Sequence, residues 1–351
     1  MLLRNLRTKK KVVAVAMSGG KDSSLAAAIL KKKGVKVVGV FMKPQETPNS
    51  KNLIEIWNRN FFQKAEQRAK QIASLLGIPF YILNFGKEFK REVINYFSNY
   101  NKKRGLFNPC AICNKEIRLE YLLKKTLSWG IDYIGTGHYA RLIQETQSSG
   151  FHLTSKKNCE YKLFVARNKR KDQSYLLWKL NQKQLKRLLF PLGDLAASEV
   201  RFLTKEFKLP ALDFSASRET CLLQTISNNF LKKHYKLNLN KIRNFQKQIS
   251  DQYQIYQGFS FFPLNKKVKR NRWKKEFLVK KINWISGKIP QLPIKVKIRI
   301  RYKNTLDTAT INYIDDETIK IVFNKPQLVI PSGQVAVFYK KEEVLGGGVI
   351  Y

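Results

Sequence analysis

The first 140 residues alternate short apolar runs with longer segments in which apolar residues recur at helical spacing. The apolar runs predict buried strands, and the longer segments predict helices. A regular succession of strand and helix is typical of a parallel, doubly wound α/β sheet. The predicted strands are 11–16, 35–42, 80–85 and 131–136, and the predicted helices are 22–33, 61–76, 87–103 and 115–129.

From residue 276 onward, polar and apolar residues alternate with a period of two between turn residues. Several short strands joined by close turns predict a small closed β-barrel. The alternating runs are 295–302, 308–313, 318–323 and 334–339, with a hairpin turn expected at Asp315-Asp316. Residues 172–208 are predicted to be mainly helical, whereas 238–275 are polar, aromatic and basic without a clear period. We therefore expect a first domain at 1–222, a central domain at 223–275 and a barrel at 276–351.

The charge of the chain is strongly one-sided, with 67 lysine and arginine residues against 25 aspartate and glutamate residues, a net charge of +42. A bias of the coding nucleotides towards lysine codons accounts for part of this excess. Whatever its origin, the positive field attracts polyanions. No strongly amphipathic basic helix indicates a membrane surface, so nucleic acid is the expected partner.

Several classes of protein are excluded or disfavoured by simple counts. No apolar run approaches the roughly 18–20 residues that cross a bilayer, which excludes an integral membrane protein. The run 12–17 is too short for the core of a signal peptide. Four cysteines in 351 residues do not make a disulfide scaffold. We expect a cytoplasmic protein that is monomeric when free.

The sharpest motif is Ser18-Gly19-Gly20-Lys21-Asp22-Ser23-Ser24, between the first predicted strand and the first predicted helix. Glycines let backbone N–H groups approach a phosphate, hydroxyl groups add donors, and a helix N-terminus supplies positive potential. It is not a Walker A loop, because Val15 and Asp22 stand where that pattern has glycine and serine or threonine. A plain turn capped by Ser18 or Asp22 is the alternative, but the density of the cluster favours a phosphate site.

A second glycine motif, Gly135-Thr136-Gly137-His138-Tyr139-Ala140, follows the fourth predicted strand. It matches the dinucleotide-binding pattern G-x-G-x-x-A, but that pattern requires a helix next. Residues 141–150 are polar and predict a turn-like segment instead. The preferred interpretation is a glycine-rich strand end beside the phosphate site.

Cys110 and Cys113 form a C-x-x-C motif, which is typical of zinc sites and redox pairs. A structural zinc site would require a second close pair, but Cys159 and Cys221 are far apart in the sequence. Alternatively, Cys113 is a nucleophile, because the N-terminus of the helix predicted at 115–129 would stabilise its thiolate. A buried, inert cysteine remains open at that position. Cys221 follows a basic, polar segment compatible with an exposed thiol, and Cys159 is interpreted as incidental.

Segments that match one known family run in order through most of the chain. They are 16–23, 39–42, 108–118, 135–141, 171–175, 190–193, the segment around Cys221, 299–302, 331–339 and 345–348. Together they resemble the tRNA-specific 2-thiouridylase family of the ATP-pyrophosphatase superfamily, whose pyrophosphate loop reads S-G-G-x-D-S. The loop alone is shared by several families, whereas the ordered set is specific.

The resemblance implies an ATP-pyrophosphatase domain, a tRNA-contacting central domain and a C-terminal β-barrel. It also implies that ATP, expected with Mg²⁺, adenylates the C2 oxygen of the wobble uridine of tRNA before a persulfide delivers sulfur to C2. A sulfur-carrier protein or a cysteine desulfurase would supply the persulfide.

The residue roles are likewise carried over from the family. Cys221 matches the carrier of the persulfide and Cys113 the cysteine that attacks it, and the two would form a transient disulfide. The positions that match ATP contacts of the family are Ala16, Met17, Ser18, Gly19, Gly20, Lys21, Asp22, Ser23, Met42 and Gly137. The positions that match its tRNA contacts are Asn108, Pro109, Cys110, His138, Lys171, Asp172, Gln173, Arg301, Tyr302 and Gln334.

The chain departs from the family pattern at two places. Some members carry aspartate at the position of Cys110, which is therefore interpreted as a base-pocket residue rather than a sulfur carrier. The central signature Y-T-x-G-Q-R-x-G-L is replaced by 257–267, which lacks its arginine and its glycine pattern. We expect the lysine-rich run 266–275 to compensate through phosphate contacts.

Two other functions remain open at this stage. One is a different ATP-pyrophosphatase that adenylates a small substrate, against which the charge and the two placed cysteines argue. The other is a tRNA-binding protein that has lost catalysis, against which the retained Asp22, Cys113 and Cys221 argue.

Overall fold

The structure is a computed structural model. It describes residues 11–43, 59–89, 91–92, 113–146, 159–210, 273–300, 305–328 and 333–351. Most of the predicted central domain, 223–275, lies outside these residues, so its boundaries remain a prediction.

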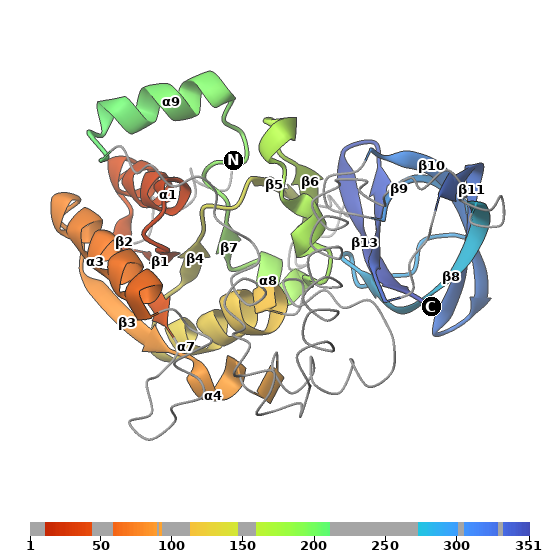
Figure 1. Cartoon of the computed structure of the whole chain (residues 1–351), viewed down its shortest axis with the longest axis horizontal. Coiled ribbons are helices and arrows are strands. Elements are labelled where there is room, and N and C mark those ends of the chain that lie inside the picture. Colours follow the sequence, from red (N-terminus) through yellow and green to blue (C-terminus); the bar gives the residue numbers. More distant parts are fainter. Residues whose placement is uncertain are drawn as a thin grey trace, which may run out of the picture.

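A parallel sheet forms the centre of the first part of the molecule, as the alternation of strand and helix predicts (Figure 1). Its five strands have the order β3-β2-β1-β4-β7, and every neighbouring pair is parallel. They are β1 (Val12–Ala16), β2 (Lys36–Lys43), β3 (Phe80–Asn84), β4 (Tyr133–Gly135) and β7 (Leu188–Leu189). The predicted doubly wound fold is thereby confirmed. The order reverses at β1, where ligand sites of such sheets form beyond the carboxyl ends of the strands.

Helices cover both faces of this sheet, and the side chains of β1 point alternately into the two cores that these helices form with it. Val13 and Val15 pack into a core with α1, α3 and α9, whereas Ala14 packs into the core that contains α7. The helical elements are α1 (Lys21–Lys32), α3 (Arg59–Leu75), α4 (Gly86–Phe89), η2 (Cys113–Tyr121), α7 (Leu122–Ser128), η3 (Lys169–Lys171), η4 (Ser174–Leu177), α8 (Gln182–Leu185) and α9 (Ala197–Glu206). Within the described parts of the chain, no helix is long and apolar enough to span a membrane.

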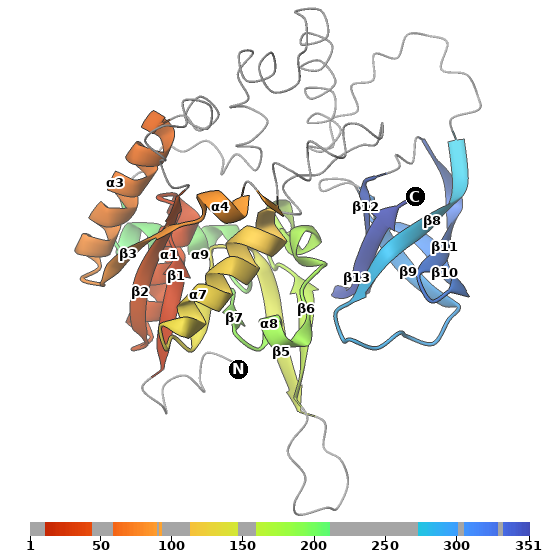
Figure 2. The same ribbon diagram turned by 90° about the horizontal axis from the view of Figure 1, so that it is seen from below.

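A closed barrel of six strands forms the C-terminal part, as the period of two predicts (Figure 2). The strands pair in the order β12-β9-β10-β11-β8-β13, and β13 pairs back with β12 to close the ring. They are β8 (Trp273–Trp284), β9 (Ile294–Arg299), β10 (Asp307–Asp315), β11 (Thr318–Leu328), β12 (Val335–Lys340) and β13 (Glu343–Ile350). The expected turn at Asp315-Asp316 joins β10 to β11.

The two parts are joined by an antiparallel hairpin of β5 (Ala140–Thr146) and β6 (Cys159–Val165). Strand β6 pairs with the barrel strand β13, so the hairpin and the barrel form one continuous sheet. Side chains from both sides share one core. The first part contributes Leu163, Tyr175, Trp178 and Leu180, and the barrel contributes Ile285, Val335, Val337, Tyr339 and Val344.

Two local predictions require correction. The turn-like segment expected at 141–150 begins as strand β5, whose partly exposed side chains hide the alternation expected of a strand. The segment 172–208 is not mainly helical, since only short helical turns and α9 lie in it, and β7 adds an edge strand to the parallel sheet. By contrast, no helix directly follows the second glycine motif. This agrees with its interpretation as a strand end rather than a dinucleotide-binding loop.

Candidate functional site

The loop between β1 and α1 is held tightly by its neighbour α3. Gly19 has a φ angle of +72°, and a Cβ atom there would lie 2.3 Å from the carbonyl oxygen of Ala65 in α3. A side chain at this position would therefore be excluded both by backbone conformation and by space. The glycine lets the loop pass directly against the helix and turn into α1.

The serines of the loop are used to hold its shape. The Ser18 backbone N–H donates to Ser23 Oγ at 3.1 Å, and Ser23 Oγ and Ser24 Oγ both donate to the carbonyl oxygen of Gly20, at 3.0 and 2.9 Å. Gly20 is the N-cap of α1 and supplies no side-chain cap. The first N–H groups of this 12-residue helix therefore have no side-chain cap at Gly20, an arrangement suited to an anion.

The end of β4 lies against the start of α1. A Cβ atom on Gly137 would lie 2.7 Å from the backbone nitrogen of Ser23 and 2.8 Å from the carbonyl carbon of Asp22. The two glycine motifs, far apart in sequence, thus meet at the carboxyl edge of the sheet. This contact confirms the interpretation of the second motif as a strand end beside the first.

Asp22, Tyr139 and Lys171 form a polar cluster at this edge. Tyr139 Oη donates to Asp22 Oδ1 at 2.7 Å, and Lys171 Nζ lies 3.1 and 3.2 Å from the two carboxylate oxygens. Lys171 Nζ also lies 3.1 Å from Tyr139 Oη and 4.7 Å from the centre of its ring. Burial, followed by the negative charge of Asp22, raises the pKa of Tyr139, so its hydroxyl stays protonated as a donor.

The segment that carries Lys171 continues into two residues with different surroundings. Gln173 makes two hydrogen bonds to the backbone of Tyr139. Its N–H donates to the Tyr139 carbonyl oxygen, and its Oε1 accepts from the Tyr139 N–H. Asp172 is 6% exposed, and its carboxylate faces away from the cluster towards the barrel. Of the three predicted tRNA contacts here, Asp172 therefore has a side chain fully engaged by the protein.

His138, in the second glycine motif, has a neutral imidazole. Its Nδ1 is 2.9 Å from Thr136 Oγ1, and its ring meets Phe190 edge to face, with the ring centres 6.3 Å apart. Burial, and then the positive charge of Arg118, lowers the pKa of His138 to about 4. At neutral pH its ring can donate one hydrogen bond and accept another but carries no charge.

The residues predicted to contact ATP therefore come together at one edge of the sheet. Ala16 ends β1 and Met42 is the second-last residue of the neighbouring β2. The loop 17–23 follows β1, and Gly137 lies just after β4 against the start of α1. Lys21 makes no ion pair with any described residue. Whether these positions bind ATP stays a prediction.

The other predicted site residues are less completely described. Cys113 is the first residue of η2, so the helix expected after it begins there, although its side chain is outside the description. Gln334 precedes β12 and is 2% exposed. The predicted residues Asn108, Pro109, Cys110, Cys221, Arg301 and Tyr302 lie outside the described residues, and so does any approach of Cys221 to Cys113.

Two residues at the site were not singled out by their sequence signals. Tyr139 stands inside the second glycine motif, but only its partner Asp22, 117 residues away, gives its hydroxyl a function. Arg299 begins a matched barrel segment, but its partner Asp172 is 127 residues away. Pairings at such distances leave no local pattern in a single sequence.

Magnesium with a polyphosphate needs few protein ligands. Mg²⁺ takes one or two carboxylates and fills its remaining positions with phosphate oxygens and waters. Within the described ranges no cluster of three or more His, Cys, Asp or Glu side chains could hold a metal alone. Asp22 offers one carboxylate at the mouth of the loop, and this donor fits a magnesium ion that arrives with ATP.

Two family models match this chain and together span most of it. A family described as "tRNA methyl transferase HUP domain" matches residues 11–225, and one described as "Aminomethyltransferase beta-barrel domain" matches residues 274–350. Their boundaries separate the parallel sheet with its hairpin from the barrel.

Full-length relatives agree with one another in their names. The tRNA-specific 2-thiouridylase MnmA of Clostridioides difficile (strain 630) is 35% identical over 367 residues, which cover 97% of this chain and 98% of the relative. The tRNA-specific 2-thiouridylase MnmA of Clostridium acetobutylicum is 34% identical over 367 residues, which cover 97% and 99%.

Similar solved structures are more remote. The U34-tRNA thiolase NcsA from Methanococcus maripaludis has a TM-score of 0.34 and 17% identity, covering 73% of this chain and 76% of its own. The NMN synthetase from Francisella tularensis has a TM-score of 0.37 and 14% identity, covering 74% and 91%. At these scores neither likeness indicates a shared function.

Proposed function

The chain belongs to the tRNA-specific 2-thiouridylase family, and from this premise we propose that it uses ATP to replace the C2 oxygen of the wobble uridine of tRNA with sulfur. It is a tRNA-uridine 2-sulfurtransferase. One matched family model is described as a methyl transferase domain and the other as an aminomethyltransferase domain. The relatives that align over 97% of the chain are named 2-thiouridylases, and we follow this full-length agreement.

One observation carries the proposal. An uncapped helix N-terminus, a glycine-rich loop and a charged cluster built by Asp22, Tyr139 and Lys171 meet at the carboxyl edge of the sheet. This edge is where parallel α/β sheets bind nucleotides. A polyphosphate there would meet backbone donors and the ammonium groups of Lys21 and Lys171.

In the first stage, the C2 oxygen of the uridine attacks the α-phosphorus of ATP and pyrophosphate leaves. The uncapped N–H groups of α1 bind the departing phosphates, and the two lysines offset their charge as it builds up. Asp22 would hold Mg²⁺ with the nucleotide, and that ion supplies further charge neutralisation to the phosphates when bound. The buried Tyr139 hydroxyl fixes the direction of the Asp22 carboxylate.

In the second stage, sulfur replaces the adenylated oxygen. We propose that Cys221 carries a persulfide, and that the Cys113 thiolate attacks the Cys221 sulfur and releases hydrosulfide as the disulfide forms. Hydrosulfide then attacks C2 and AMP leaves, giving 2-thiouridine. A dithiol reductant restores both thiols. Cys113 is the first residue of η2, and this position supports its role as the attacking thiolate because a helix N-terminus stabilises a thiolate.

The remaining assignments are proposals that rest on the family. The ATP-pyrophosphatase domain is taken as 1–222, the central domain as 223–275 and the barrel as 276–351. The tRNA contacts include His138, Lys171, Gln173 and Gln334, together with Asn108, Pro109, Cys110, Arg301 and Tyr302. Asp172 is the remaining family position, and we assign it to tRNA through the backbone of its segment because its side chain is engaged by the protein. We place the enzyme in the cytoplasm, where its sulfur comes from a persulfide-donating carrier protein or a cysteine desulfurase.

The test is a reconstitution with purified protein, unmodified tRNA, ATP, Mg²⁺ and a persulfide source. We expect AMP and pyrophosphate to be released and one uridine of the tRNA to gain the mass of sulfur in place of oxygen. Release of ADP and phosphate would contradict the adenylation step. A tRNA that gains a methyl group or nothing at all would contradict the proposed function.

A further inference from the structure

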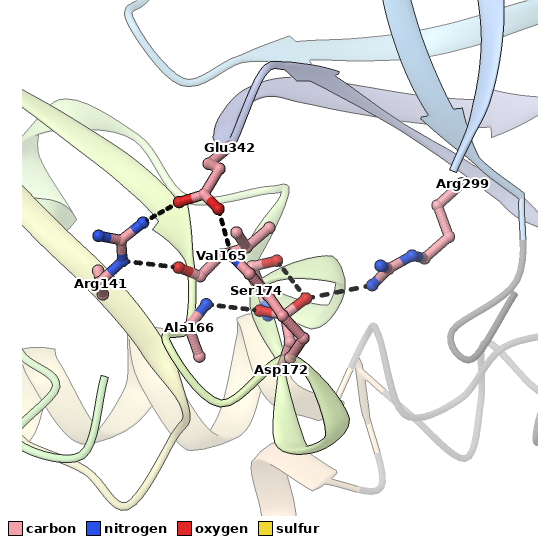
Figure 3. Close-up of polar contacts among 8 residues, drawn as sticks. Arg141, Val165, Ala166, Asp172, Ser174, Arg299 and Glu342 are labelled. Atoms are coloured by element: carbon pink, nitrogen blue, oxygen red, sulfur yellow. Dashed lines mark hydrogen bonds and ion pairs between the residues drawn. The ribbon is translucent and has the colours of Figure 1, made fainter. Parts of the chain in front are cut away.

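Asp172 and Arg299 form a buried ion pair between the two parts of the molecule (Figure 3). Arg299 Nη1 lies 3.1 Å from Asp172 Oδ2, and the two side chains are 14% and 3% exposed. The guanidinium group also lies over the ring of Tyr339, with 5.5 Å between its central carbon and the ring centre. Arg299 ends the barrel strand β9, whereas Asp172 belongs to the segment beside the pyrophosphate loop.

Among the described residues, four donors hold the carboxylate of Asp172. Oδ1 accepts from the backbone N–H groups of Ala166 and Ser174, at 3.0 and 3.3 Å. Oδ2 accepts from Ser174 Oγ at 3.0 Å and from Arg299. A buried carboxylate with this many donors has one orientation, and the backbone that carries it is fixed with it.

The neighbours of Asp172 on the chain face the nucleotide edge. Lys171 contacts Asp22 and the hydroxyl of Tyr139, and Gln173 pairs with the backbone of Tyr139. Three consecutive residues therefore join the pyrophosphate loop, the strand end and the barrel. On the barrel side, Arg301 and Tyr302, which are proposed tRNA contacts, follow Arg299 closely in the sequence.

We propose that Asp172 and Arg299 are positioning residues for the adenylation step: the barrel, through Arg299, sets the segment 171–173 and thereby places the Lys171 ammonium group at the pyrophosphate loop. The inference rests on the proposed function and adds to it a role for the barrel in catalysis. The barrel then does more than hold tRNA, because an arginine on it determines the geometry of a lysine at the nucleotide.

A second polar contact across the same interface provides a matched control. Glu342, in the turn between β12 and β13, pairs with Arg141 (Figure 3). It also pairs with Lys169, whose Nζ lies 2.5 Å from Glu342 Oε1. Its side chain is 51% exposed, and its partners do not contact Asp22. Glu342→Gln removes two exposed ion pairs between the same two parts of the molecule and leaves the buried one in place.

The experiment compares the full-length wild-type protein with Asp172→Asn, Arg299→Gln, their double variant, Arg299→Lys and Glu342→Gln. Pyrophosphate release is measured in single turnovers at saturating ATP and tRNA, at a temperature where thermal melting shows each variant folded. We expect each of the two uncharged variants to lose about tenfold in rate while the Kd for tRNA changes less than about threefold. The double variant is expected to be no slower than the slower single one, because both changes release the same segment.

Two further readouts separate positioning from simple stabilisation. Arg299→Lys keeps the charge and should recover part of the rate even if its melting temperature stays low. Glu342→Gln should keep the wild-type rate within about twofold. Should Asp172→Asn or Arg299→Lys fail to fold, Arg299→Gln with Glu342→Gln still decides the matter.

The proposal is overturned if Asp172→Asn and Arg299→Gln lower only the melting temperature and keep the wild-type rate, or if their losses add in the double variant. Failure of the proposed function looks different, because the wild-type protein itself then releases no pyrophosphate with tRNA. In that case ATP affinity, measured by calorimetry, replaces the rate: weaker binding in the two variants but not in Glu342→Gln supports the placement of Lys171, and equal binding refutes it.

Discussion

Tyr139 and Asp22 lie 117 residues apart in sequence, and the tyrosine hydroxyl donates a 2.7 Å hydrogen bond to one carboxylate oxygen of the aspartate. Tyr139 is 1% exposed, so its ring is fixed by the core while its hydroxyl faces the loop 18–23. The contact joins the end of β4 to the first turn of α1. It gives the aspartate a direction in addition to its ion pair with the half-exposed Lys171.

Tyr139→Phe removes this donor and leaves the ring in place. We expect the free energy of unfolding to fall by about 1 kcal/mol, the usual net value of one hydrogen bond. We expect pyrophosphate release to slow by about fivefold, because the Asp22 carboxylate loses its orientation. Chemical denaturation and single-turnover pyrophosphate assays measure the two effects.

Tyr175→Phe is the matched control. Tyr175 is equally buried, and its hydroxyl donates to the carbonyl oxygen of Val335 in the barrel at 2.9 Å. It should lose a similar stability but keep its rate of pyrophosphate release. Equal rates for the two variants would show that the Tyr139 hydroxyl has no special part at the nucleotide edge.

Gly137→Ala tests the contact between the strand end and the helix. Its Cβ atom would lie 2.7 Å from the Ser23 nitrogen and 2.8 Å from the Asp22 carbonyl carbon, and both are backbone atoms that cannot turn aside. The start of α1 must shift, and displacements of this kind cost about a hundredfold in rate. We expect that loss in pyrophosphate release, with tRNA affinity unchanged in a filter-binding assay.

Gly135→Ala, two residues earlier, serves as the comparison. There the new Cβ atom would meet side-chain carbons, Leu30 Cδ1 at 2.7 Å and Val15 Cγ2 at 3.3 Å. Overpacking of the core should lower stability by about 1–3 kcal/mol. The rate at a temperature where this variant is folded should stay far above that of Gly137→Ala, and a reversed order would contradict the assigned contact.

His138 gives the stability of the fold a specific pH dependence. The pKa of the folded imidazole is lowered from 6.5 to about 4, so between these values the unfolded chain binds a proton that the folded chain does not. The contribution of the neutral imidazole to the free energy of unfolding is complete above pH 6.5 and is lost as the pH falls towards 4. The expected loss is about 3 kcal/mol at most, measured by urea denaturation across this range.

His138→Gln should flatten the pH dependence in that window. Carboxylates also titrate as the pH approaches 4, but they do so in both proteins, and the difference between the two curves isolates the histidine. Identical curves for the variant and the wild type would mean that folding does not lower the pKa of the imidazole.

The proposed cysteine chemistry predicts a separation of the two stages. Cys113→Ser and Cys221→Ser should each stop the formation of 2-thiouridine but still allow pyrophosphate release, because activation precedes sulfur transfer. Cys159→Ser should behave as wild type, since Cys159 is exposed at the start of β6. Cys110→Asp should retain substantial activity, as the family accepts aspartate at this position. Mass spectrometry of the tRNA distinguishes these outcomes, and an active Cys221→Ser enzyme would overturn the persulfide assignment.

The periodic elements of this fold were predictable from the sequence because their patterns are local. The strands and helices around the first glycine motif follow from apolar runs and helical spacing, and most barrel strands follow from a period of two. Strand β13 was not predicted, because Gly346, Gly347 and Gly348 weaken the expected pattern. Their small size is required by packing: a Cβ atom on Gly347 would lie 2.9 Å from a ring carbon of Trp178.

The candidate site was predictable only in part for a related reason. The loop 18–23 is recognisable as a phosphate site from the sequence alone, because a dense cluster of glycine and hydroxyl residues between a strand and a helix is typical of such sites. Asp172 does not, since an aspartate beside lysines in a polar segment is typical of an exposed surface. Its burial depends on Arg299, and a single sequence carries no trace of which distant arginine meets which aspartate.

The shared strand β13 affects how the chain can be divided. It pairs with β8 and β12 inside the barrel and with β6 outside it, and the core beneath β6 includes side chains from both parts. A fragment that ends before the barrel would leave the backbone of β6 as an open edge, Trp178 uncovered and the Asp172 carboxylate without its counter-ion. Such a fragment should aggregate rather than behave as an independent ATP-binding domain, so separate expression of the two halves is the wrong way to assign their activities.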